Sequence, residues 1–145
     1  MDHVLLARIS LSFLCAIQGI ATAAIDFNRT HATNPSWTGH ARFHVVWQST
    51  TVVLLSVLEL LLIWSAGAFQ SDRFYLASLL AAASPAGFLI SFACRQAFGG
   101  TLFDPNGIPP LNLRLFGAVR SIDLNLAAVI AALISLVAII AIYRV

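Results

Sequence analysis

The residues best suited to chemistry lie together between Asp26 and His44, in the segment DFNRTHATNPSWTGHARFH. The segment contains one acid, three histidines and two arginines, whereas most of the surrounding chain is aliphatic. His40 and His44 stand one helical turn apart, so their imidazoles can reach a common partner. A nearby carboxylate such as that of Asp26 can orient an imidazole for proton transfer. We therefore predict that His40, His44 and Asp26 are catalytic residues.

The same residues also form a candidate metal site. His40 and His44 would supply two ligands, and Asp26 or His31 would complete a set of three or four for zinc or copper. However, the H-x-x-x-H pattern lacks the adjacent glutamate of zinc proteases. The plainer alternative is that these are interfacial histidines, which hydrogen-bond to backbone, to Asp26 or to lipid headgroups. The metal, the polar network and the acid–base role stay open as alternatives.

A wider set of polar and aromatic residues is expected to bind a ligand at this site. Arg42 and Arg95 are suited to a phosphate or carboxylate headgroup, and Trp37 to the wall of a pocket mouth. The predicted ligand-binding residues are His31, Trp37, Arg42, Trp47, Gln48, Glu59, Arg95 and Arg8.

The composition indicates that these residues are positioned by membrane-spanning helices. The chain has 145 residues, of which 59% are hydrophobic and 10% charged, and its mean hydropathy is +0.88. A soluble domain of this size needs a more polar surface. The formal net charge of +2 is dispersed and does not indicate a nucleic-acid partner. Four apolar stretches approach the ~20 residues needed to cross a bilayer; they cover about 4–25, 40–69, 74–98 and 122–143.

We therefore predict an all-α, antiparallel up-down four-helix transmembrane bundle that forms one domain, residues 1–145. The short turn at 70–73 pairs the second and third spans, which places the elaborated loops 26–44 and 99–121 on one face. Residues 111–120 are expected to form a short amphipathic segment in the interface. That face carries five arginines against three, which favours a cytoplasmic location. Without Arg42 and Arg95 the counts are three and three, and the orientation stays open.

Helical periodicity places the polar residues of the second span on one arc, which includes His40, His44, Gln48, Thr51 and Glu59. Because a polar stripe is costly against lipid, the arc is predicted to face the bundle interior. Glu59 then lies at mid-membrane with Arg8 as its expected partner, either as a structural ion pair or in a functional role.

Around these residues the sequence shows a resemblance to known membrane proteins. The run DFNRTHATNPSWTGHARFHVVWQ resembles the N-P-x-W-x-x-H-x-x-x-H signature of an uncharacterised family of short four-span membrane proteins. The residues that carry the likeness are Asp26, His31, Asn34, Pro35, Trp37, His40, Arg42 and His44. More distantly, the layout is similar to that of DoxX-like and sterol-isomerase-type membrane proteins. The latter likeness implies a bundle cavity for a hydrophobic ligand, without the residue pattern of the isomerases.

Four functions are compatible with this pattern. The first is a multi-pass membrane protein that binds an apolar or amphiphilic small molecule in a polar pocket inside the bundle at the 26–44 face. The second is an acid–base enzyme of the isomerase or cyclase type that uses Asp26, His40 and His44. The third is a structural or accessory subunit, and the fourth a transporter, for which one four-helix unit would have to form a homo-oligomer.

Overall fold

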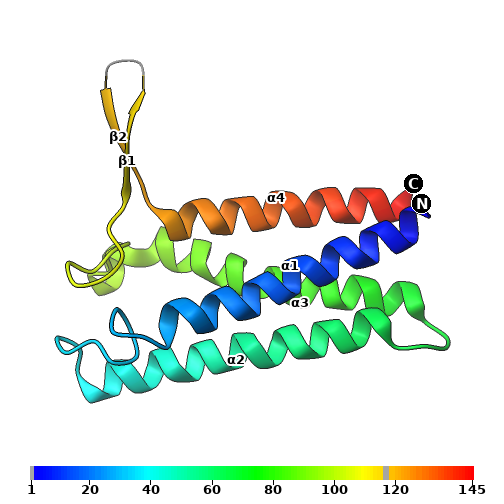
Figure 1. Cartoon of the computed structure of the whole chain (residues 1–145), viewed down its shortest axis with the longest axis horizontal. Coiled ribbons are helices and arrows are strands. Elements are labelled where there is room, and N and C mark those ends of the chain that lie inside the picture. Colours follow the sequence, from blue (N-terminus) through cyan, green and yellow to red (C-terminus); the bar gives the residue numbers. More distant parts are fainter. Residues whose placement is uncertain (1, 116–117) are drawn as a thin grey trace.

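Four long helices form the body of the protein, and the computed structural model describes them within residues 2–115 and 118–145 (Figure 1). They are α1 (His3–Asp26), α2 (Gly39–Trp64), α3 (Gln70–Cys94) and α4 (Leu124–Arg144). All four are long and apolar enough to cross a membrane. The protein is thus an integral, multi-pass membrane protein whose spans contact the lipid bilayer, as the sequence predicts. Met1 and, within the predicted segment 111–120, Phe116 and Gly117 lie outside the described residues.

The helices are packed antiparallel in a ring, in which α1 and α3 each contact both α2 and α4. Both chain ends lie at the same end of the bundle (Figure 1). We call that end the turn face, because it also carries the short connection 65–69. The opposite end carries residues 27–38 and 95–123 and is called the loop face. The two elaborated loops therefore share one face, as predicted.

Side-chain caps begin three of the helices. The Thr38 hydroxyl accepts a hydrogen bond from the Ala41 amide (3.2 Å) at the start of α2. Asp123 accepts from the Leu126 amide (2.8 Å) at the start of α4. The Asp2 carboxylate accepts from the Val4 amide (3.1 Å) at the start of α1.

Two predicted boundaries at the turn face are wrong. The second span ends at Trp64 instead of 69, because Ser65 is extended and Gly67 has a φ of +101°. Phe69, with φ +63°, then leads into α3, so residues 70–73 form its first turn. The Arg73 guanidinium donates to the carbonyl oxygens of Ala66 and Ala68 and so holds this connection in place.

Two departures from the predicted elements occur at the loop face. The third span changes at Arg95 into a 3-10 turn, η1 (Arg95–Phe98), which ends at Gly99 with φ +67°. The predicted amphipathic segment is an antiparallel hairpin of β1 (Leu111–Leu115) and β2 (Ala118–Ile122). The hairpin runs across the helix axes and projects beyond α4 (Figure 1).

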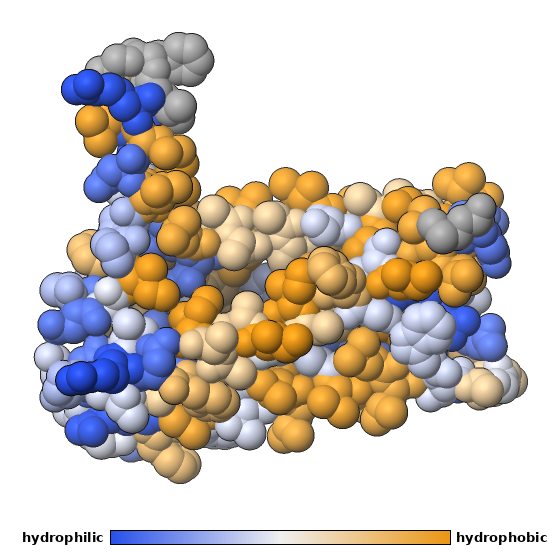
Figure 2. All heavy atoms as spheres, in the orientation of Figure 1, coloured by the Kyte–Doolittle hydropathy of each residue, from blue (hydrophilic) through white to orange (hydrophobic). Residues whose placement is uncertain are grey.

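Small side chains allow α1 and α2 to approach closely. The buried stripe of α1 consists of Ala7, Leu11, Cys15 and Gly19. A Cβ atom added at Gly19 would lie 2.7 Å from the Ser56 Oγ atom and 2.9 Å from its Cβ atom, so only glycine fits there. The outer surface of the helices is mainly apolar and the loop face is polar, as expected for spans that face lipid (Figure 2).

Candidate functional site

At the loop face several polar residues form a network of hydrogen bonds and one acid–imidazole contact, which starts at Asp26, the last residue of α1. The buried Ser49 hydroxyl on α2 lies 2.6 Å from Asp26 Oδ2 and 2.7 Å from the Val45 carbonyl oxygen, and so shares its proton between them. Asp26 Oδ1 lies 3.9 Å from Nδ1 of His31, and the two side chains are 19% and 21% exposed. The acid at the end of α1 therefore contacts both the second helix and the loop that follows it.

The loop between α1 and α2 positions His31 through its own backbone contacts. Asn34 is fully buried; its side-chain amide donates to the Thr30 carbonyl oxygen (3.0 Å) and its Oδ1 accepts from the Ser36 amide (3.0 Å). The Thr30 hydroxyl lies 2.8 Å from His31 Nδ1. The His31 ring stands edge-on to the Trp37 ring at 5.5 Å between centroids. The imidazole is therefore held between Asp26, Thr30 and Trp37.

Trp37 connects this loop to the second elaborated loop. Its indole Nε1 donates to Asp104 Oδ2 (3.1 Å), and the Asn106 side-chain amide donates to the Ser36 hydroxyl (3.1 Å). The indole N–H, and next the Asn106 backbone N–H, lower the pKa of Asp104, because both stabilise its carboxylate. Two segments far apart in the sequence thus form one surface. Sequence reasoning missed Asp104 and Asn106 because nothing local indicates their distant partners.

His40 and His44 lie on a different side of α2 from this network. Their Nε2 atoms are 3.0 Å apart, and both side chains are exposed. At about 100° per residue, His40 lies opposite Ser49 around the helix axis, and Ser49 faces α1. The predicted inward orientation of this part of the arc is therefore wrong. The physical reason is that the first turns of α2 lie at the loop face, where histidines do not need to be shielded from lipid.

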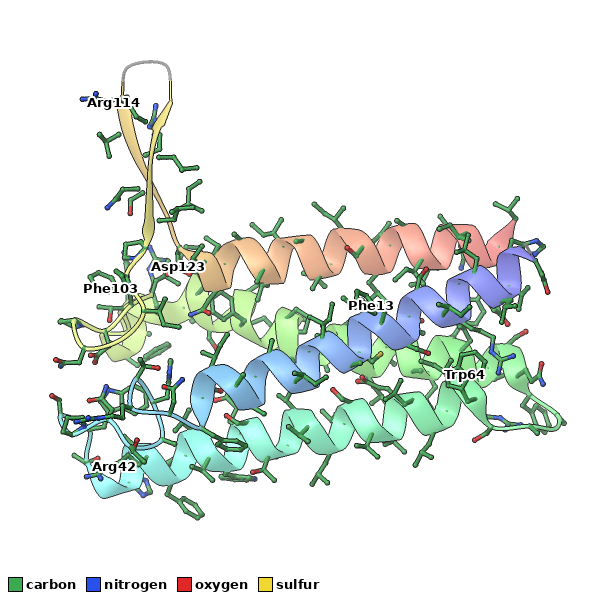
Figure 3. All side chains as sticks on the ribbon, in the orientation of Figure 1. Phe13, Arg42, Trp64, Phe103, Arg114 and Asp123 are labelled. Atoms are coloured by element: carbon green, nitrogen blue, oxygen red, sulfur yellow. The ribbon has the colours of Figure 1, made fainter. Side chains whose placement is uncertain are left out.

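The other predicted site residues near the start of α2 are likewise either exposed at the surface or partly buried in the network. Trp47 and Gln48 are exposed, and Trp47 packs against Phe43 and His44 at the surface. Arg42 is partly buried, and its Nε donates to the Trp37 carbonyl oxygen (3.2 Å). Figure 3 shows Arg42 at the loop face and Trp64 near the turn face.

The four predicted metal ligands fall into two pairs, Asp26 with His31 and His40 with His44. Within residues 2–115 and 118–145, no three His, Cys, Asp or Glu side chains are grouped closely enough to hold a metal ion. Cys15 is buried and Cys94 exposed, and both are free thiols. The four predicted metal ligands are divided into two pairs because of the rotation of α2 about its axis, which the sequence pattern does not determine.

Glu59 is buried at mid-span, with an exposed fraction of 2%. The prediction that Arg8 is its ion-pair partner is wrong. Arg8 instead donates from Nε (3.0 Å) and Nη2 (2.6 Å) to the Ile63 carbonyl oxygen, and its guanidinium lies 4.7 Å from the Trp64 ring centroid. Glu59 Oε2 has no hydrogen-bond partner among the described residues. Cys15 lies beside this carboxyl group. Arg8 thus satisfies a carbonyl oxygen at the end of α2, where helix carbonyls lack internal partners.

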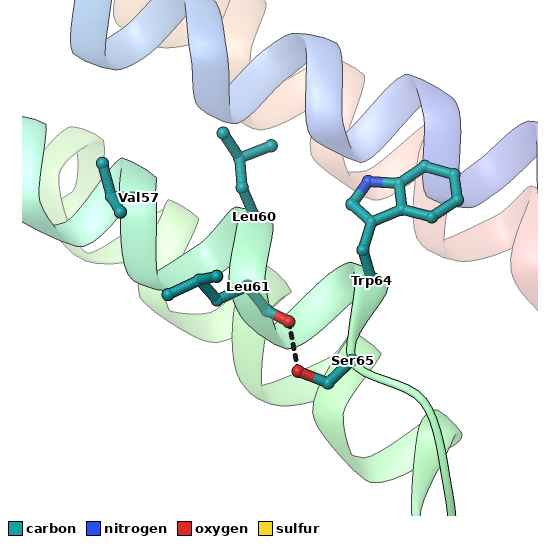
Figure 4. Close-up of a pocket in the computed structure, with 5 residues that line it drawn as sticks. All are labelled: Val57, Leu60, Leu61, Trp64 and Ser65. Atoms are coloured by element: carbon teal, nitrogen blue, oxygen red, sulfur yellow. Dashed lines mark hydrogen bonds between the residues drawn. The ribbon is translucent and has the colours of Figure 1, made fainter.

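Two of the cavities that the described residues form open on the outer surface of the bundle. The larger, about 320 Å³, lies at the turn-face end of α2 and is lined by Val57, Leu60, Leu61, Trp64 and Ser65 (Figure 4). The second, about 130 Å³, lies at the loop face where α3 becomes η1. Its lining consists of Phe88, Ser91, Phe92, Arg95, Phe98, Gly100, Thr101 and Leu102.

The second cavity combines a cation with aromatic walls. Arg95 Nη1 donates to the Phe92 carbonyl oxygen (2.8 Å), and the guanidinium carbon lies 4.2 Å from the centroid of the Phe92 ring. Arg95 is a predicted ligand-binding residue that lines this cavity, whereas His40 and His44 line neither of the two cavities. Phe88, Ser91 and Arg95 recur at intervals of three and four residues, and this helical spacing places them on one face of the third span.

Comparison with known proteins finds no matching family model, no matching curated protein and no matching solved structure.

Proposed function

We propose that this membrane protein binds an amphiphilic molecule with an anionic headgroup at the Arg95 cavity. The observation that carries the proposal is the placement of a guanidinium within a cavity walled by Phe88, Phe92 and Phe98, at the end of a span. This is the depth at which lipid headgroups meet the hydrocarbon layer. The polar part of the ligand contacts Arg95, and its apolar part contacts the aromatic rings.

The size of the cavity limits how the ligand binds. A site that encloses a drug-sized molecule measures about 300–1,000 Å³, whereas this cavity measures about 130 Å³. It holds a carboxylate or phosphate and a few carbon atoms, and the remaining chain lies along the apolar surface of the spans. This differs from the polar pocket inside the bundle that the sequence suggests, because the ligand enters from the membrane side.

The contacts of Arg95 leave it able to bind an anion. A guanidinium has five N–H donors, and the hydrogen bond from Nη1 to the Phe92 carbonyl oxygen uses one of them. The hydroxyl groups of Ser91 and Thr101 line the same cavity and add donors. A charge-assisted hydrogen bond in such a setting contributes about 1.5–3 kcal/mol.

The test compares Arg95→Gln with the wild type in a neutral detergent. Oleate and phosphatidylglycerol probe a carboxylate and a phosphate headgroup, and phosphatidylcholine is the zwitterionic control. We expect the anionic lipids to raise the melting temperature of the wild type, and Arg95→Gln to weaken their binding about tenfold or more. The matched control is Arg29→Gln, which removes an exposed arginine of the other loop. Unchanged binding in Arg95→Gln, or equal binding of phosphatidylcholine, would overturn the proposal.

A second candidate function is acid–base catalysis on the bound amphiphile, as in an isomerase or cyclase. The observation that favours it is the Asp26–His31 pair, which is mostly buried and held at 3.9 Å beside the second loop. In this version His31 replaces His40 and His44 as the group that moves the proton, and Asp26 orients it. Lipids that copurify with the wild type and with His31→Gln would be compared by chromatography and mass spectrometry. Catalysis predicts that the variant retains an isomer that the wild type converts, whereas identical lipids would argue for binding alone.

A further inference from the structure

The hairpin of β1 and β2 is joined almost directly to the start of α4. Ile122 ends β2 and Leu124 begins α4, so only Asp123, the helix cap, separates the strand from the span. The hairpin runs across the helix axes (Figure 1), with Arg114 near its far end and Asp123 where it joins α4 (Figure 3). Because the helices cross the membrane, a hairpin that runs across their axes lies along the membrane surface.

The strand register divides the hairpin into two unlike faces. Side chains of directly paired residues lie on the same side of a sheet, and successive pairs alternate. The pairs Leu111–Ile122 and Leu113–Arg120 therefore share one face, and Asn112–Ser121 and Arg114–Val119 share the other. The first face is mainly aliphatic, whereas the second carries an amide, a hydroxyl and a guanidinium.

The aliphatic face is turned toward the side on which the membrane lies. Apolar side chains gather along the side of the hairpin that faces the helical body, and polar ones along the opposite side (Figure 2). Among the residues that the structure describes, no helix packs against either strand to a substantial extent. Leu111 is 46% and Leu113 36% exposed within the protein itself. An isolated two-stranded hairpin is marginally stable in water, so these leucines need an apolar surface that the protein does not provide.

We propose that this hairpin lies in the headgroup layer of the membrane, with its leucines toward the hydrocarbon and its arginines on anionic lipid phosphates. Arg114 projects from the polar face, and Arg120 can bring its guanidinium from the aliphatic face to the headgroups by extending its stem. Basic side chains next to a span are attracted to anionic lipids. The hairpin thereby anchors the loop face, including the loop that contains Asp104, against the membrane surface. The inference does not depend on a ligand at Arg95.

The test places nitroxide labels on the two faces of the hairpin. Leu113→Cys and Asn112→Cys are made in a chain in which Cys94, the exposed thiol, is replaced by serine. In vesicles of phosphatidylcholine and phosphatidylglycerol, we expect the label at 113 to collide mainly with oxygen and the label at 112 mainly with a water-soluble nickel complex. Equal exposure of both labels to the nickel complex would overturn the proposal.

Two further measurements separate the lipid surface from other causes. In the double variant Arg114→Gln, Arg120→Gln, the difference between the two labels should shrink, and removing phosphatidylglycerol from the wild type should have the same effect. Spin–spin broadening that grows with protein density would show that a second copy of the chain covers the aliphatic face, and it would overturn the lipid assignment. Circular dichroism on each variant verifies that the spans remain folded, so a lost difference reports on the hairpin.

Discussion

At the scale of single residues, Trp37 connects the two halves of the loop face. Its ring contacts His31, its carbonyl oxygen accepts from Arg42, and its indole donates to Asp104. Two of the three partners, His31 and Arg42, are close to Trp37 in the sequence, whereas Asp104 belongs to the second elaborated loop. Trp37 therefore joins the two loops through its side chain and its backbone, alongside the Asn106–Ser36 hydrogen bond, whereas the sequence suggests for it only the wall of a pocket mouth.

The hydrogen bond between Trp37 and Asp104 should make the protein more sensitive to acid. The pKa of Asp104 is lowered in the folded protein, so its carboxylate stabilises the fold fully above its ordinary pKa of 3.8. That stabilisation is lost as the pH falls through the lowered pKa of the native state. In Trp37→Phe the principal cause of the shift is removed, so we expect the melting temperature of the variant to fall less steeply below about pH 4 than that of the wild type.

The matched control for this pH dependence is Trp64→Phe. Trp64 also donates an indole hydrogen bond, to the Ser12 hydroxyl at 2.8 Å, but it lies near the turn face. This variant should retain the acid dependence of the wild type. Parallel acid curves for Trp37→Phe and the wild type would contradict the role assigned to the indole.

At the scale of helices, the contact between α1 and α2 depends on the absence of a side chain. Gly19 lies against Ser56, and the same stripe of α1 continues with Cys15 beside Glu59 and Leu11 in the core. Close approach of backbones at small residues is a general means of packing helices in lipid, where the hydrophobic effect does not drive helix association. The α1–α2 pair is therefore held mainly by shape and by buried polar groups.

Gly19→Ala should destabilise the bundle by about 1–3 kcal/mol, because the added Cβ atom would overlap Ser56. Gly87 is the control, since a Cβ atom added there meets nothing within 4 Å. Gly87→Ala should leave stability unchanged or raise it by up to about 1 kcal/mol. Reversible unfolding in mixed micelles measures both values. Equal effects of the two substitutions would contradict the close contact, and Ser56→Gly should partly restore the stability of Gly19→Ala.

At the scale of the whole molecule, the two faces differ in size and in charge. The turn face is compact. The rings of Phe74 and Tyr143 are stacked with 3.8 Å between their centroids, and the Tyr143 hydroxyl donates to the Ser71 hydroxyl. The loop face holds the hydrogen-bonded network, the Arg95 cavity and the hairpin. Ligand binding and surface attachment are thus both expected on the same side of the membrane.

We expect the loop face to be cytoplasmic, because it carries five arginines against three on the other side. Thr33→Cys and Ala68→Cys, each made in the chain with Cys94 replaced by serine, place one thiol on each face. A membrane-impermeant maleimide should label position 68 in intact cells and position 33 only after permeabilisation. The reverse labelling would contradict the cytoplasmic location of the loop face.

The sequence by itself determined the membrane class, the four spans and the shared location of the two loops. These features follow from the length of apolar runs and from chain connectivity, and both are local properties. It also identified Arg95 as a candidate ligand-binding residue. Helical periodicity alone, however, placed His40 and His44 inside the bundle together with Glu59.

Only the tertiary structure decided which side of α2 faces α1. The fit of Ser56 against Gly19 and of Ser49 against Asp26 sets that rotation, and it leaves His40 and His44 on the outside. The link from Trp37 to Asp104 and the pairing of the strands likewise join residues that are distant in the chain. Such contacts depend on the shapes of two surfaces at once, and the periodicity of one segment carries no information about the surface that it meets.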